Sequence, residues 1–192
     1  MSSPMTPGFA DPVLGAQSSF RAMLHALSHP GRIVALPDVP QAPAPLGPAM
    51  AALALALCDA DTPLWHDGGA AVADWLRFHT GAPLAPAHAA RFLAATSAPP
   101  ALAGLALGSD EAPQDGATLL LQVSALEAAA GWSLSGPGIE TTTALRVSGA
   151  PLGFVAERAA LGALFPRGLD IMLCAGRHIV GLPRTTIIRE ER

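Results

Sequence analysis

Three consecutive residues near the end of the chain could bind an anion. Arg184, Thr185 and Thr186 place a guanidinium group beside two hydroxyls. Pro183 biases the backbone before it towards an extended conformation, so the guanidinium of Arg184 could project beyond the end of a strand. A guanidinium fork pairs well with a carboxylate or a phosphate. An ion pair within the fold is the alternative, and the residue pattern leaves both open.

A glycine-rich turn is the second candidate for anion binding. Ser135, Gly136, Pro137 and Gly138 follow an expected strand, and the main-chain amides of such a turn can cradle a phosphate. Pro137 has no amide hydrogen, however, and the chain has no lysine to complete a phosphate loop. The missing amide hydrogen and the missing lysine both favour a structural turn over a phosphate site.

Two histidines have the spacing of a metal site. His25 and His29 are four residues apart at the end of an expected helix. Ala26 stands where hydrolytic zinc sites have a glutamate, and Pro30 ends the helix. Because histidines at a helix C-terminus complement the helix dipole, the pair is interpreted as capping residues, and we expect no metal ion.

Acidic residues also cluster in the first half of the chain. Asp59, Asp61, Asp67 and Asp74 could suggest a magnesium site, but closely spaced acids between a helix and a strand are usually solvated loop residues. His66 and Asp67 could form an acid–base pair only beside a nucleophile, and the sequence has no Gly-x-Ser-x-Gly elbow to supply one. No catalytic residue follows from this cluster.

The composition excludes several classes of function. All 11 basic residues are arginine, and the chain has neither lysine nor tyrosine. Without lysine no Schiff base can form, so we expect no pyridoxal phosphate or other cofactor. The net charge of −4 and the scattered arginines argue against nucleic acid as a partner. Cys58 and Cys174 lie far apart in apolar runs and are expected to be small buried hydrophobes.

The low charge content points to a protein partner. Only 14% of the residues are charged and 51% are hydrophobic, whereas about a quarter are charged in an average domain. Soluble monomers rarely expose large apolar patches, so we expect a buried partner surface and a homodimer. Candidate contributors are residues 154–165 and the surroundings of Trp65 and Trp75.

No segment is expected to enter a membrane. Prolines interrupt the longest charge-free stretches, residues 39–58 and 92–109. The remaining helical parts, about ten residues or 15 Å long, are too short for a bilayer core of about 30 Å. Residues 1–20 lack the basic and apolar regions of a signal peptide. We therefore expect a cytoplasmic protein.

The order of hydrophobic patterns predicts an α/β protein. Helices are expected at 11–28, 49–58, 70–79 and 154–164, and strands at 32–36, 62–66, 118–123, 132–135, 145–148, 170–175 and 178–182, with an extended segment at 185–189. Residues 89–96 could be strand or helix, and 99–108 loop or short helix. Strands that alternate with helices and then close in a hairpin around Gly176 indicate a three-layer α/β/α sandwich on a mixed sheet. We expect one domain over residues 1–192.

Short motifs occur in a fixed order along nearly the whole chain. They are FADP at 9–12, FR at 20–21, HPGR at 29–32, DADTPLW at 59–65, RFHTG at 77–81, LG at 107–108, ATL at 117–119, SGPGI at 135–139, FP at 165–166 with Gly168 and Asp170, and LPRTT at 182–186. No single motif is decisive, but the ordered set is specific. It resembles a known family, the H subunit of the bacterial carbon–phosphorus lyase (phosphonate C–P lyase) core complex.

The resemblance implies a fold, partners and a pathway. The fold is expected to be similar to the large domain of pyridoxal-phosphate-dependent transferases without the cofactor site. The partners are a second copy in the isolated homodimer and the G, I and J subunits in the core complex. With the G, I and L subunits, the family supports displacement of adenine from MgATP by an alkylphosphonate, which gives a ribose 1-phosphonate 5-triphosphate; the J subunit later cleaves the C–P bond. No catalytic residue is carried over to this chain.

Two functions therefore remain open. The favoured one is an accessory subunit that is not catalytic alone. The alternative is a small-molecule-binding subunit that contributes anion ligands, such as Arg184 or the amides of residues 135–138, to a shared phosphonate or nucleotide site.

Overall fold

The computed structural model describes residues 6–191, so the first five residues of the segment examined for a signal peptide lie outside the described part. Its α-helices are α1 (Pro12–Ser28), α2 (Pro48–Leu57), α3 (Gly69–Thr80) and α4 (Phe154–Ala160). Its strands are β1 (Val34–Ala35), β2 (Leu64–His66), β3 (Phe92–Ala95), β4 (Thr118–Gln122), β5 (Ala125–Ser135), β6 (Thr143–Ser148), β7 (Asp170–Ala175), β8 (His178–Leu182) and β9 (Ile187–Glu190). Short 3₁₀ turns are η1 (Ala87–Ala89), η2 (Leu102–Gly104), η3 (Pro113–Asp115) and η4 (Leu161–Leu164).

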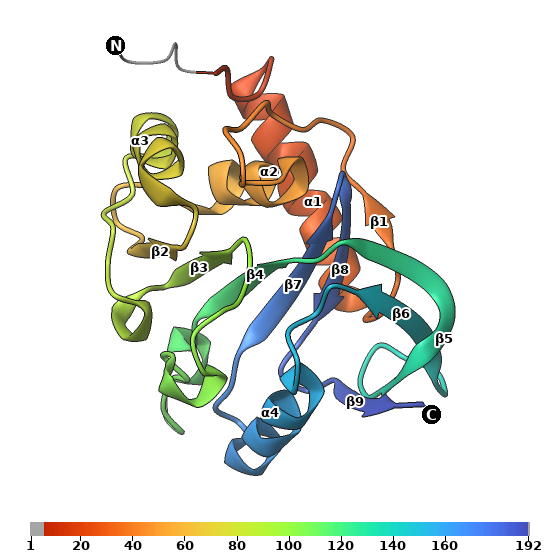
Figure 1. Cartoon of the computed structure of the whole chain (residues 1–192). Helices are drawn as coiled ribbons and strands as arrows, with labels where there is room; N and C mark the ends of the chain where they lie inside the picture. The colour runs from red at the N-terminus through yellow and green to blue at the C-terminus, as the bar shows by residue number, and fades with distance from the viewer. Residues whose placement is uncertain (1–5, 192) are drawn as a thin grey trace.

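A six-stranded mixed sheet forms the centre of the molecule, with the strand order β1-β8-β7-β4-β3-β2 (Figure 1). Strands β2, β3, β4 and β7 run parallel to one another, and β8 returns antiparallel to β7 as the predicted hairpin around Gly176. The α/β class and the mixed sheet are thus confirmed. The segment 89–96, which periodicity leaves undecided, contains strand β3, which lies between two parallel neighbours.

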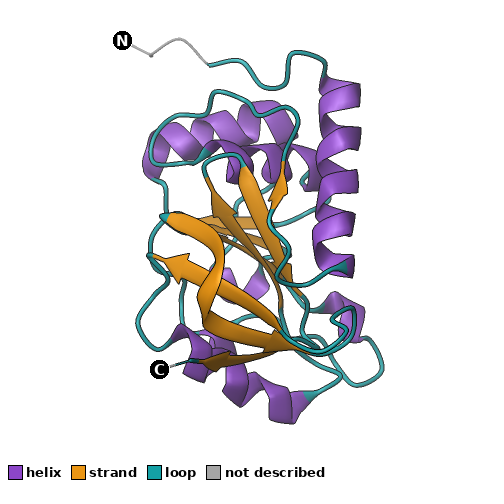
Figure 2. Cartoon of the chain, turned by 90° about the vertical axis from the view of Figure 1, so that its right-hand side faces the viewer, coloured by secondary structure: helices purple, strands orange, loops and turns teal. Residues whose placement is uncertain are grey.

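Helices α1, α2 and α3 cover one face of this sheet, as Figures 1 and 2 show. Alternate strand residues such as Ala94, Leu120 and Met172 face them and form one core with α2, which is buried over most of its length. The predicted start of α1 is confirmed, because Asp11 caps it by accepting hydrogen bonds from the amides of Val13 and Leu14, each at 3.0 Å.

The opposite face differs from the helical layer of the expected sandwich. A second, three-stranded sheet of order β6-β5-β9 covers it together with α4. Strand residues of the opposite parity, among them Leu93, Leu119 and Ile171, pack there against Trp132 and Phe154. The local reason is that β5 is an 11-residue strand, much longer than predicted, and pairs with β6 on one side and β9 on the other.

Within residues 6–191, no helix has both the length and the apolar character needed to span a bilayer. The expected likeness to pyridoxal-phosphate-dependent transferases and the single-domain organisation stay predictions.

Candidate functional site

The two segments predicted to bind an anion meet in the second sheet. Strands β5 and β9 are antiparallel, with Ser135 paired to Ile187. Gly136 packs so closely on the next segment that an added Cβ would lie 2.8 Å from the carbonyl oxygen of Thr185. The structure therefore places Ser135 and Gly136 beside the Thr185–Thr186 dipeptide, although about 50 residues separate them in the sequence.

Gly138 is directed elsewhere, towards the end of α1. The amide of Ile139 donates a hydrogen bond to the carbonyl of Gly136 at 3.1 Å, which closes a four-residue turn. Pro137 at the second position and Gly138 at the third, with a φ of 84°, have the sequence and the positive φ of a type II turn. A Cβ on Gly138 would lie 2.7 Å from the carbonyl oxygen of Ser28. These contacts support the structural interpretation of this turn.

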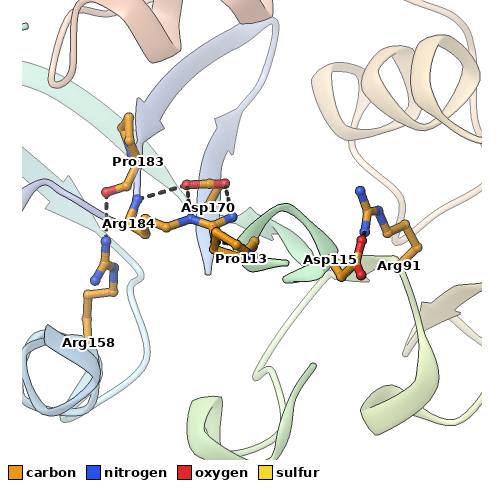
Figure 3. Close-up of polar contacts among 7 residues, drawn as sticks. All are labelled: Arg91, Pro113, Asp115, Arg158, Asp170, Pro183 and Arg184. Carbon is orange, nitrogen blue, oxygen red and sulfur yellow. Dashed lines mark hydrogen bonds and ion pairs between the residues drawn. The ribbon is translucent and has the colours of Figure 1, made fainter. Parts of the chain in front are cut away.

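Arg184 forms an ion pair inside the fold (Figure 3). Its Nη2 lies 2.6 Å from Asp170 Oδ2, its Nε donates to Asp170 Oδ1 at 3.4 Å, and its backbone amide donates to the same Oδ1 at 2.8 Å. Its Nη1 donates to the carbonyl of Pro113. The guanidinium is thus turned towards Asp170 and Pro113, away from α4. Of the two interpretations left open by the sequence, this geometry favours the internal ion pair.

A second arginine, which the sequence analysis did not single out, lies on the other side of Pro183. Arg158 comes from α4, is only 3% exposed, and donates from Nη2 to the carbonyl of Pro183 at 2.7 Å (Figure 3). Burial lowers the pKa of its guanidinium; the charge of Asp170 acts in the opposite direction and that of Arg184 adds to the lowering. A charged group held this deeply is a candidate for function.

Arg158 lines a pocket of about 320 Å³ between α4, η4 and the segment that leads into β9. The predicted residues Arg184, Thr185 and Thr186 line the same pocket. The remaining lining residues are small or apolar: Ala159, Gly162, Phe165, Ile187 and Ile188. The pocket therefore combines a buried cation and hydroxyl groups with an apolar wall.

Asp67, His25 and His29 make hydrogen bonds within the fold. Burial alone would raise the pKa of Asp67, but its carboxylate accepts hydrogen bonds from the amides and hydroxyls of Thr96 and Ser97 at 2.7–3.0 Å, and these hold the pKa below its ordinary value. His29 Nδ1 donates to the carbonyl of His25 at 3.0 Å at the end of α1. Among residues 6–191, no three His, Cys, Asp or Glu side chains are grouped to hold a metal ion.

Comparisons with known proteins match nearly the whole chain. The family model described as bacterial phosphonate metabolism protein (PhnH) matches residues 7–189. The chain is 39% identical, over 95% of its length and 94% of the relative's, to alpha-D-ribose 1-methylphosphonate 5-triphosphate synthase subunit PhnH of Rhizobium meliloti (strain 1021). It is 36% identical, over 90% of its length and 85% of the relative's, to the putative C-P lyase subunit protein HtxG of Stutzerimonas stutzeri.

Proposed function

The chain belongs to the PhnH family of bacterial phosphonate metabolism proteins, and we propose that it is an accessory subunit of a cytoplasmic carbon–phosphorus lyase core complex. In this role it acts with the G, I and L subunits in the displacement of adenine from MgATP by an alkylphosphonate, which yields a ribose 1-phosphonate 5-triphosphate. The observation that carries the proposal is the end-to-end similarity to a relative that is itself named as a synthase subunit.

The surface of α1 supports a role in assembly. Val13, Phe20 and Leu24 are exposed, and their spacing of seven and four residues places them on one side of the helix. A row of exposed apolar side chains on a helix is typical of a surface that another protein covers. In the regions expected to form a partner surface, Trp75 and Phe154 are buried in the chain's own cores, whereas Phe165 is exposed. We therefore propose α1 as a further partner surface beside the region of Phe165.

Reconstitution of phosphonate-dependent adenine release tests the function directly. The G, I, J and L subunits are combined with MgATP and methylphosphonate, with and without this chain, and released adenine is quantified by chromatography. The proposal expects release only in the presence of this chain. Full release in its absence would overturn the proposed function.

A charge placed on α1 tests the proposed assembly surface. Phe20→Glu should change the melting temperature of the isolated chain by only a few degrees, because the side chain is 43% exposed, but should reduce co-purification with the G, I and J subunits. Leu152→Glu is the control, since Leu152 is a fully exposed apolar residue and lies far from α1 in the sequence. Equal co-purification of both variants would exclude α1 as the assembly surface. Light scattering of the same samples tests the proposed homodimer.

The second candidate function is a small-molecule-binding subunit that contributes anion ligands to a shared site. The observation that favours it is the pocket lined by Arg158, Arg184, Thr185 and Thr186. Calorimetric titration of the isolated chain with MgATP and with an alkylphosphonate tests it. Heats equal to those of dilution in both titrations would exclude ligand binding by the isolated chain. The accessory role would then be the one remaining function.

A further inference from the structure

We infer that the pocket between α4 and the segment 184–188 binds a small organic oxyanion, a phosphonate or carboxylate that carries an apolar group of about the size of a phenyl ring, and that Arg158 is its anchor. The inference deepens the second candidate function and rests on it. It assigns the charged contact to Arg158, whereas the sequence pattern pointed to Arg184.

The first argument is the charge balance around Pro183. Arg158, Arg184 and Asp170 are the charged groups that act on one another here. Asp170 forms an ion pair with Arg184, with Nη2 and Oδ2 2.6 Å apart. Arg158 forms no ion pair with any carboxylate in residues 6–191. A buried cluster with two cations and one anion has one uncompensated positive charge, and buried charges are normally paired. An anion in the pocket supplies the missing partner.

The second argument is unused hydrogen-bonding capacity. A guanidinium has five N–H donors, and Arg158 donates one hydrogen bond, from Nη2 to Pro183. Its Nε is buried without an acceptor in the described part of the chain, and so is the hydroxyl of Thr186, a residue that is also only 3% exposed. Both residues line the pocket. Such groups are rarely left unsatisfied, and a ligand with more than one oxygen would supply the acceptors that the chain does not provide here.

The third argument concerns the apolar wall and the size of the pocket. Phe165 and Ile187 line it and are exposed, whereas Arg158 and Thr186 are buried. The charged end of a ligand therefore lies deep, and its apolar end lies near the mouth. A volume of about 320 Å³ is at the lower end of the range for small-molecule sites, roughly 300–1,000 Å³. The pocket thus fits a small molecule better than a polymer.

Four probes separate these features in calorimetric titrations of the isolated full-length chain. Phenylphosphonate and benzoate carry the same ring on different oxyanions, inorganic phosphate has the charge without the ring, and benzamide has the ring without the charge. We expect saturable binding of phenylphosphonate, benzoate or both, and at least about tenfold weaker binding of phosphate and benzamide. The stronger of the two aromatic acids identifies the oxyanion.

Two variants test the site itself. Arg158→Met removes the charge and keeps an apolar side chain of similar reach, and should weaken binding on the order of 30-fold or more. Gly162→Leu keeps every charge but fills the pocket, because a Cβ on Gly162 meets no atom within 4 Å, and should abolish binding. Gly104→Leu is the matched control, since its Cβ is equally unobstructed and it does not line the pocket. This control should bind like the wild type.

Three results would overturn the inference. The first is a folded wild type that binds no aromatic acid, and the second is binding that either Arg158→Met or Gly162→Leu leaves unchanged. The third is binding of phosphate as tight as that of phenylphosphonate, which removes the role of the apolar wall. If Arg158→Met instead blocks co-purification with the other subunits while no probe binds, the anchor meets a partner's carboxylate and the small-molecule site is refuted. The accessory role is judged separately, by adenine release.

Discussion

Replacing Arg184 with alanine should destabilise the fold strongly, because the substitution leaves a carboxylate without its main partner. In the wild type the Arg184 guanidinium contacts both oxygens of Asp170 and also donates to the carbonyl of Pro113. The side chains of Arg184 and Asp170 are only 15% and 29% exposed. After the substitution, Asp170 keeps the hydrogen bond from the backbone amide of residue 184 but loses its ion-pair partner, and only the more distant charge of Arg158 still acts on it.

The expected loss follows from how deeply the pair is buried. Removing one partner of a fully buried pair costs about 3–5 kcal/mol, and an exposed pair contributes roughly 0–1 kcal/mol. The partial exposure of both groups lowers the first figure to about 2–4 kcal/mol. For a chain of this size, each kcal/mol shifts the melting temperature by about 2–4 °C. We therefore expect Arg184→Ala to melt on the order of 5–15 °C below the wild type.

Thermal and urea unfolding followed by circular dichroism provide the measurement, with Arg91→Ala as the matched control. Arg91 pairs with Asp115 at 3.7 Å across side chains that are 40% and 66% exposed (Figure 3), so its loss should cost under about 1 kcal/mol. The double variant Arg184→Ala/Asp170→Ala should recover part of the lost stability. If Arg184→Ala melted no lower than Arg91→Ala, the ion pair would contribute little and Arg184 would again be a candidate for contacts outside the fold.

Three further predictions follow from single contacts. Asp67→Asn should lower the free energy of unfolding by about 1–3 kcal/mol near neutral pH. Because the pKa of Asp67 is lowered in the folded state, the difference from the wild type should shrink as the pH falls below about 4 and through the folded-state pKa, as measured by urea unfolding. Burial raises the pKa of the Cys58 and Cys174 thiols to about 12, so neither should react with Ellman's reagent at about pH 8 until the chain is unfolded; rapid reaction of the native protein would contradict their burial. Gly181→Ala should lower the melting temperature sharply or prevent folding, since its Cβ would lie 2.7 Å from backbone atoms of Ala26 and Leu27, whereas Gly104→Ala has open space and should not.

The elements with strong local signals could be predicted from the sequence. Helix α1 has an aspartate cap, a proline at its first position and a proline soon after its end, and these features placed it within a residue. Strand β4 has three consecutive leucines at its centre, and the β7–β8 hairpin has glycine at its turn. Each of these signals lies within the element itself, so no knowledge of distant partners was needed.

The second sheet depends on contacts that the local sequence does not contain. The first part of β5, residues 125–131, consists mostly of alanine with one leucine and one glutamate, residues that favour helix over strand. Its strand conformation comes from pairing with β6, as in Glu127 with Arg146, and Ser135 pairs with Ile187 at the far end. Tertiary pairing overrode local preference here. The same pairing brought the two predicted anion-binding segments together, which their separation in the sequence concealed.

The two arginines around Pro183 show why a functional residue can be misidentified from its neighbours. Arg184 is conspicuous because proline and two threonines flank it, yet Asp170 occupies its guanidinium. Arg158 lies in an ordinary amphipathic helix, but it falls at the helical spacing of Phe154, Val155 and Leu161, all of which are buried. A permanent charge on the core-facing side of a helix must find a partner or destabilise the fold. The helical spacing of Arg158 was visible in the sequence. Only the structure showed that Asp170 is already paired with Arg184 and that a pocket adjoins Arg158.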